Sequence, residues 1–141
     1  MVDVGRHVLA VRDLAVEFGL TQGVVRALDA VNLDLHAGRV LGVVGESGCG
    51  KSVTALAILG ILDRPGRVVS GSVVLDPGAP EQLELTALDG DSRALRAVRG
   101  RRIGMIFQEP MTALSVHYTI GNQIVEAIRA HKDFSKAAAR A

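Results

Sequence analysis

The run Gly-Glu-Ser-Gly-Cys-Gly-Lys-Ser at residues 45–52 decides the fold that we expect for this chain. It fits the pattern G-x-x-x-x-G-K-[ST], which binds a polyphosphate when it joins a strand to a helix. Both flanks meet that condition. Residues 40–44 (VLGVV) are apolar on both faces, as a strand buried in a parallel sheet requires. Residues 52–62 repeat apolar side chains at helical spacing.

The residue types within this loop suit phosphate binding. Its glycines allow positive φ angles and a close approach of backbone N–H groups to an anion. The N-terminus of the following helix adds free N–H groups and the positive end of its dipole. Lys51 supplies a full charge near the β and γ phosphates, and the Ser52 hydroxyl is placed to ligate Mg²⁺. We predict the following nucleotide-binding residues: Gly45, Glu46, Ser47, Gly48, Cys49, Gly50, Lys51, Ser52 and Val53.

Composition limits the alternatives. The chain has 141 residues, 48% of them hydrophobic and 22% charged, which describes about one globular domain. A single cysteine excludes a disulfide framework, and a net charge of +1 argues against nucleic acid as the main partner. The first residues lack the apolar core of a signal peptide, and no apolar run is long enough to span a membrane, so we expect a cytoplasmic location.

The rest of the chain alternates strands and helices. Residues 8–18 and 24–35 alternate apolar and polar side chains, which predicts an antiparallel hairpin. Further strands are expected at residues 72–75 and 103–107, and further helices at 92–99, at 120–131 and beginning at Ser135. The order indicates an α/β fold with parallel core strands.

A second motif narrows the class of phosphate-loop protein. Residues 105–114 read MIFQEPMTAL, and Gln108 lies 57 residues after Lys51. Together with the loop at 45–52 and with RPGRVVSG at residues 64–71, this segment resembles the Q-loop region of ABC transporter ATPases. The combination is similar to the ATP-binding subunits of oligopeptide and dipeptide importers and of their nickel-importing relatives.

The resemblance implies a P-loop NTPase core with an N-terminal antiparallel β subdomain, incomplete at the C-terminus. Residues 1–119 would form the β subdomain and the first part of the core, and residues 120–141 would begin a helical subdomain. The resemblance also implies that Phe18 stacks on adenine and that Gln108 ligates Mg²⁺ or orients the attacking water. The cofactors would be ATP and Mg²⁺, and Glu109 to Thr119 would contact the membrane permease.

The same resemblance implies partners and an activity. The protein would hydrolyse ATP on the inner face of the cell membrane to energise import of peptides or related small solutes. It would pair with a second ATPase subunit and with permease subunits, and indirectly with an extracytoplasmic solute-binding protein. No Leu-Ser-Gly-Gly signature, no apolar strand ending in Asp-Glu and no switch histidine occurs before Ala141. We therefore expect weak ATP binding and negligible turnover from this chain alone.

Two other functions stay open on the sequence. A small P-loop kinase or GTPase would share the loop at residues 45–52, although the guanine-specific motif Asn-Lys-x-Asp is absent. A truncated, non-catalytic remnant would bind nucleotide or permease only.

Overall fold

A computed structural model describes residues 5–108 and 114–140. The chain forms two compact units, one up to Leu95 and one from Arg96 onward, and each is described by itself. None of the helices in these described ranges has the length and apolar character needed to cross a membrane.

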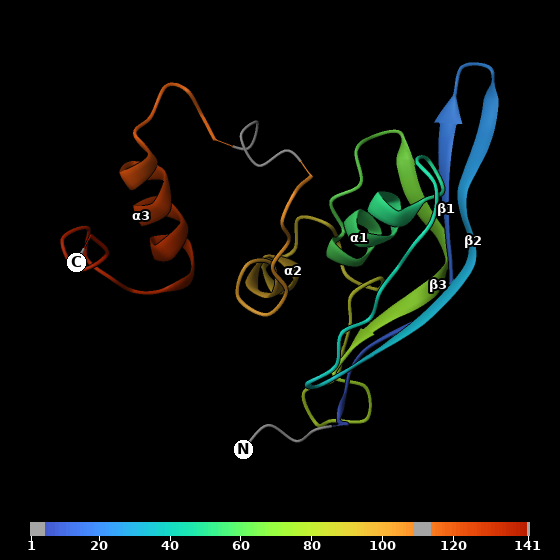
Figure 1. Cartoon of the computed structure of the whole chain (residues 1–141), viewed down its shortest axis with the longest axis horizontal. Coiled ribbons are helices and arrows are strands. Elements are labelled where there is room, and N and C mark those ends of the chain that lie inside the picture. The colour runs from blue at the N-terminus through green and yellow to red at the C-terminus, as the bar shows by residue number, and fades with distance from the viewer. Residues whose placement is uncertain (1–4, 109–113, 141) are drawn as a thin grey trace. The chain divides into compact units, whose positions relative to one another are not determined.

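A long hairpin organises the first unit (Figure 1). Strand β1, His7–Leu20, pairs antiparallel with strand β2, Gly23–His36, along their whole length. The hairpin predicted from residues 8–18 and 24–35 is confirmed. Their alternating pattern is a local property of the sequence, and a short turn at Thr21 and Gln22 lets the two strands pair without any other part of the chain.

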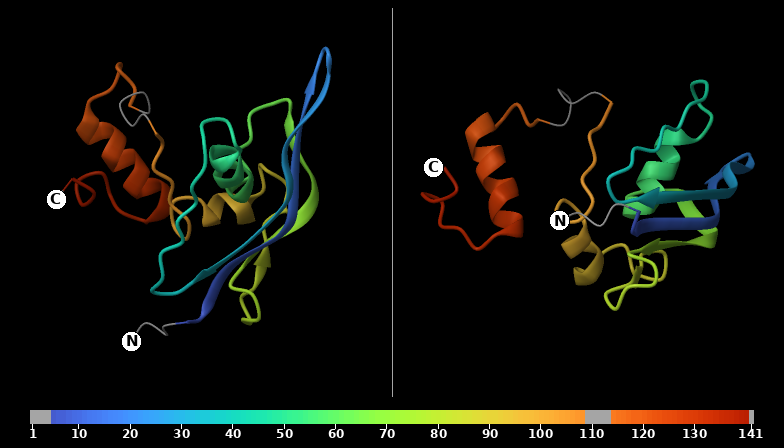
Figure 2. Two further views of the ribbon diagram at one scale, coloured as in Figure 1. Left: turned by 45° about the vertical axis from the view of Figure 1, so that its right-hand side comes forward. Right: turned by 60° about the horizontal axis from the view of Figure 1, so that its bottom comes forward.

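Two further strands complete an antiparallel sheet in the order β2-β1-β3-β4. Strand β3, Gly66–Leu75, pairs with β1, and the short strand β4, Leu83–Glu84, pairs with β3. The views in Figure 2 show the strong twist of this sheet. Strand β3 starts earlier than the predicted residues 72–75 because the long β1 offers it pairing partners as far as Phe18.

The core of the first unit lies along β1 and β3. Leu14, Val11, Val16 and Val73 are among its fully buried side chains. Helix α1, Lys51–Leu59, contacts β2 and β3 and buries Ala57 and Leu59. It ends at Gly60, whose φ of 63° is left-handed, and is therefore shorter than the predicted 52–62.

The strand expected at residues 40–44 is not formed, so this prediction is wrong for the structure. These residues have no regular secondary structure, and Val40 and Val44 are 98% and 93% exposed. A strand that is apolar on both faces is stable only with a neighbour on each edge and a layer on each side. Within the described ranges no strand pairs with residues 40–44.

The second unit is helical. Helix α2, Arg93–Val98, lies within the predicted range 92–99 and buries Leu95 and Val98, and helix α3, Ile120–His131, has the predicted bounds. The strand predicted at residues 103–107 is not formed: Ile103 makes a single bridge to Arg99, and Ile106 is 92% exposed. The helix predicted from Ser135 is only a series of turns, in which the Ser135 hydroxyl accepts a hydrogen bond from the N–H of Ala138.

The fold prediction is therefore confirmed for its antiparallel part. The parallel core strands that it also required are absent from the described residues. Both missing strands are the fully apolar kind, whose stability depends on distant parts of a chain.

Candidate functional site

The loop at residues 45–50 leads directly into helix α1. Gly50 precedes the helix with a φ of 94°, a left-handed angle that side chains rarely adopt. A Cβ atom at this position would also lie 2.7 Å from Cδ2 of Leu28 and 3.0 Å from the carbonyl oxygen of Ala27. Gly50 is thus required both by its conformation and by its contact with β2, and it fixes where the helix begins.

Two other glycines shape the loop. Gly48 has a φ of 83°, a left-handed backbone conformation that glycine adopts more readily than other residues. At Gly45 a Cβ atom would lie 2.5 Å from Sγ of Cys49. The loop therefore folds back on itself, and the Cys49 side chain would have to rotate away to admit a side chain at position 45.

The Lys51 ammonium lies within the curve of the loop. Its Nζ donates hydrogen bonds to the carbonyl oxygens of Gly45 at 2.7 Å and Glu46 at 2.6 Å, and contacts Sγ of Cys49 at 3.3 Å. An ammonium has three donors, and the loop supplies an acceptor for each. A phosphate that enters the loop has to replace these acceptors, for which the charge-assisted bond to an anionic oxygen is well suited.

The other predicted loop residues are open to solvent. Glu46, Ser47, Cys49 and Ser52 are exposed, and Val53 is half-buried on the first turn of α1. The Ser52 hydroxyl thus lies on an accessible helix start, where a divalent cation could reach it. These side chains are thus accessible from solvent.

Phe18 lies near the end of β1. It is half-buried and pairs with Val25 of β2 on one side and with Gly66 of β3 on the other. The loop contacts the neighbouring strand β2, because Gly50 packs on Ala27 and Leu28. Val25, the pairing partner of Phe18, and the residues that Gly50 contacts lie on β2, two to three residues or about 7–10 Å apart along the strand.

Glu17, the residue before Phe18, forms ion pairs with arginines of both neighbouring strands. Glu17 accepts hydrogen bonds from Arg26 of β2, at 3.0 Å from Nη2, and lies 4.0 Å from Arg67 of β3. The bond to Glu17, with help from Asp29, raises the pKa of Arg26. Because Glu17 and Phe18 are neighbours on a strand, their side chains leave opposite faces of the sheet. Glu17 thus links β1, which carries Phe18, to the neighbouring strands β2 and β3.

Gln108 belongs to the second unit, where it is exposed. A shared Mg²⁺ site of Ser52 and Gln108 therefore stays a prediction. Of the segment predicted to contact a permease, residues 109–113 lie outside the described residues. The rest, Leu114 to Thr119, is exposed and precedes α3.

Sequence reasoning missed two residues that shape these regions. In the sequence Gly66 is only one residue of the run at 64–71, yet in the structure a Cβ atom on it would meet the Phe18 ring. The side chain of Gln123 binds the backbone of the Leu114–Thr119 segment. A glycine in an otherwise β-branched strand pattern was the available signal for the first. An amide one turn after the Thr119 helix cap was the signal for the second.

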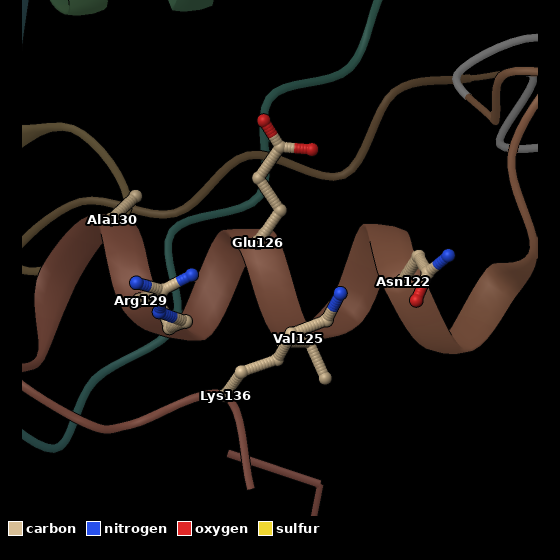
Figure 3. Close-up of a pocket in the computed structure, with 6 residues that line it drawn as sticks. All are labelled: Asn122, Val125, Glu126, Arg129, Ala130 and Lys136. Atoms are coloured by element: carbon tan, nitrogen blue, oxygen red, sulfur yellow. The ribbon is translucent and has the colours of Figure 1, made fainter.

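The second unit also has a hollow of about 600 Å³ beside α3 (Figure 3). Its lining includes the cations of Arg129 and Lys136, while the Glu126 carboxylate projects away from Lys136 (Figure 3). None of the predicted nucleotide-binding residues lines it. Its walls are one face of α3, in which Val125 is buried and Glu126, Arg129 and Ala130 are exposed, and Lys136 from the turns that follow.

With this geometry described, comparison with known proteins identifies the class. The chain belongs to the ABC transporter family, whose family model matches residues 28–141. It is 48% identical, over 131 residues, to the probable peptide ABC transporter ATP-binding protein y4tR of Sinorhizobium fredii, covering 93% of this chain and 37% of that protein. It is also similar to the dipeptide transport ATP-binding protein DppD of Haemophilus influenzae, at 43% identity over 92% of this chain and 37% of the relative.

The DppD protein of Escherichia coli gives the same result, with 41% identity over 94% of this chain and 38% of the relative. The chain thus spans less than two-fifths of the length of these relatives. The resemblance that its motifs showed to ABC transporter ATPases is confirmed at the level of the family.

Proposed function

We propose that this chain binds MgATP and that, as part of a complete ABC transporter subunit, it hydrolyses ATP to energise import of peptides or related small solutes. The phosphates would lie in the loop of residues 45–53. The observation that carries the proposal is the Lys51 ammonium held inside a loop that closes around it. The printed names of the relatives, which are peptide and dipeptide transport ATP-binding proteins, support the substrate class.

Each residue would act through its own chemistry. Lys51 would exchange its carbonyl acceptors for β and γ phosphate oxygens, and the N–H groups at the start of α1 would add hydrogen bonds. Phe18 would stack on the adenine ring, a contact between aromatic faces. Ser52, with Gln108, would hold Mg²⁺, which neutralises phosphate charge when bound.

The remaining assignments follow from the same proposal. Residues 1–119 would form the β subdomain and the first part of the core, with residues 120–141 beginning the helical subdomain. The exposed segment from Leu114 to Thr119 would contact a permease, which places the protein on the inner face of the membrane. A second ATPase subunit would complete the catalytic site, because transition-state charge needs groups that this chain lacks.

The test is equilibrium binding of MgATP to the purified 141-residue chain. We expect Lys51→Ala to weaken binding by at least about tenfold, the loss of one charge-assisted bond of 1.5–3 kcal/mol. Lys136→Ala, which removes an exposed lysine of the second unit, is the matched control and should bind as the wild type does. Equal affinity of the Lys51→Ala variant would refute the loop as the site, and preference for MgGTP would favour a GTPase.

Hydrolysis is tested separately. The isolated chain should release no phosphate above background, since a phosphate loop supplies only part of the charge stabilisation that phosphoryl transfer needs. Turnover of about one per second that Lys51→Ala abolishes would show instead that the chain is a self-sufficient enzyme, as a small kinase or GTPase would be.

A further inference from the structure

The ring of Phe18 occupies the space that any side chain at position 66 would need. Gly66 lies opposite Phe18 in the pairing of β3 with β1. A Cβ atom on Gly66 would lie 2.7 Å from Cε1 and 2.9 Å from Cζ of the Phe18 ring. Both atoms are at the outer end of the ring. The ring therefore reaches from β1 over the backbone of β3 at this residue.

Space, and not backbone conformation, is what demands glycine here. The φ of Gly66 lies outside the left-handed range, so an L-residue could adopt its backbone angles. Its N–H donates to the carbonyl oxygen of Asp63 at 2.8 Å, a bond that any residue except proline could make. The Asp63 carbonyl oxygen, 2.9 Å from the same Cβ position, is the other obstacle to a side chain.

The surrounding strands hold this arrangement in register. Glu17 bridges Arg26 of β2 and Arg67 of β3, which are the sequence neighbours of Val25 and Gly66. These ion pairs lie on the face of the sheet opposite Phe18, and the backbone pairing of β1 with β2 and β3 holds the register. A side chain at position 66 would displace the Phe18 ring and not the backbones of the paired strands, because the ring can rotate about its side-chain bonds.

We propose that Gly66 is a positioning residue for recognition of the nucleotide base: its missing side chain lets the Phe18 ring lie over β3, and this sets where the ring meets adenine. The proposal rests on the base contact of Phe18 in the proposed function. Gly66 does not touch the phosphates in this proposal, so its effect is confined to ligands that carry a base.

The first experiment compares binding of MgATP and of magnesium tripolyphosphate, which lacks the nucleoside, to the 141-residue chain. Gly66→Ala should weaken MgATP binding about three- to tenfold, a part of the stacking contribution of one base, and leave tripolyphosphate binding unchanged. Gly19→Ala is the matched control, because Gly19 follows Phe18 in the same strand and a Cβ there meets nothing within 4 Å. It should bind both ligands as the wild type does.

A double-mutant cycle with Phe18→Ala isolates the contact. If Gly66 acts through the ring, Gly66→Ala should change nothing further once the ring is gone, although the contact with the Asp63 carbonyl remains. An equal loss for both ligands, or an undiminished loss in the Phe18→Ala background, would overturn the proposal. If Phe18→Ala leaves the ratio of the MgATP and tripolyphosphate affinities unchanged, the base contact of the proposed function is refuted. If Phe18→Ala lowers that ratio but Gly66→Ala has no effect, only the role of Gly66 is refuted.

A measurement on the wild type keeps the test valid even if the alanine variant does not fold. In NMR spectra, MgATP should shift the Phe18 ring signals and the Gly66 amide signal together, whereas tripolyphosphate should leave both in place. A Gly66 amide that does not respond to MgATP while the Phe18 ring does would contradict the proposal.

Discussion

The side-chain amide of Gln123 pairs with the backbone of Ser115 in both directions. Its Oε1 accepts the Ser115 N–H at 2.8 Å, and its Nε2 donates to the Ser115 carbonyl oxygen at 2.9 Å and to that of Tyr118 at 2.9 Å. One side chain at the start of α3 thus replaces a strand partner for an exposed loop. Val116 and Tyr118 are held there with large exposed apolar surfaces.

We expect Gln123→Met, which keeps the length of the side chain and removes its polar atoms, to release this loop. The Ser115 amide loses its acceptor, so its hydrogen exchange should accelerate about fivefold, the equivalent of one net hydrogen bond of about 1 kcal/mol. Gln82→Met is the control, because Gln82 accepts the Gly78 N–H in a different turn. Unchanged Ser115 exchange in the Gln123→Met variant would mean that the loop is ordered by other contacts.

Gly50→Ala should destabilise the first unit. The substitution forces a side chain into a left-handed conformation and against Leu28 and Ala27, which together should lower the free energy of unfolding by about 1–3 kcal/mol. Urea denaturation followed by circular dichroism measures the change. Gly42→Ala has open space and an ordinary φ, so it should cost almost nothing. Equal effects of the two substitutions would contradict the contact with β2.

Acid should weaken the ion pairs of the hairpin through Asp34. Its carboxylate lies 2.7 Å from Arg12 and 2.6 Å from His7, and the hydrogen bond from Arg12 holds its pKa below the usual 3.8. A lowered pKa in the folded state means that the stabilisation is complete above pH 3.8 and is lost as the pH falls through the lowered value.

The measurement compares the free energies of unfolding of the wild type and Asp34→Asn across this range. The advantage of the wild type should shrink as the pH falls below 3.8 toward the lowered pKa of Asp34. High salt should also reduce it, because all three partners are at least partly exposed. An advantage that grows as the pH falls would be the opposite of the expected sign.

The exposed state of residues 40–44 is itself testable. Val40→Thr with Val44→Thr should change the free energy of unfolding by no more than about 0.5 kcal/mol, as surface substitutions do. Val73→Thr, at a fully buried position, should cost about 1–3 kcal/mol because it buries a hydroxyl. A large loss from the double variant would show that this segment is a buried strand in solution.

The sequence by itself determined the elements whose stability is local. The hairpin of β1 and β2 followed from alternating side chains and a short turn, and α3 followed from the helical spacing of apolar residues over 120–131. The phosphate loop was predicted because its chemistry needs particular residue types at fixed spacing, and Gly48 and Gly50, but not Gly45, have positive φ angles.

Only the tertiary structure decided which residues meet across the sheet and which apolar runs become strands. Residues 40–44 and 103–107 have a strand pattern but no strand partner in the described ranges, and a pattern cannot supply a neighbour. The contact of Gly66 with Phe18 depends on the register of β3 against β1, which joins residues 48 positions apart. Pairing of that kind is set by packing between distant segments, so the role of Gly66 is visible only once the sheet has formed.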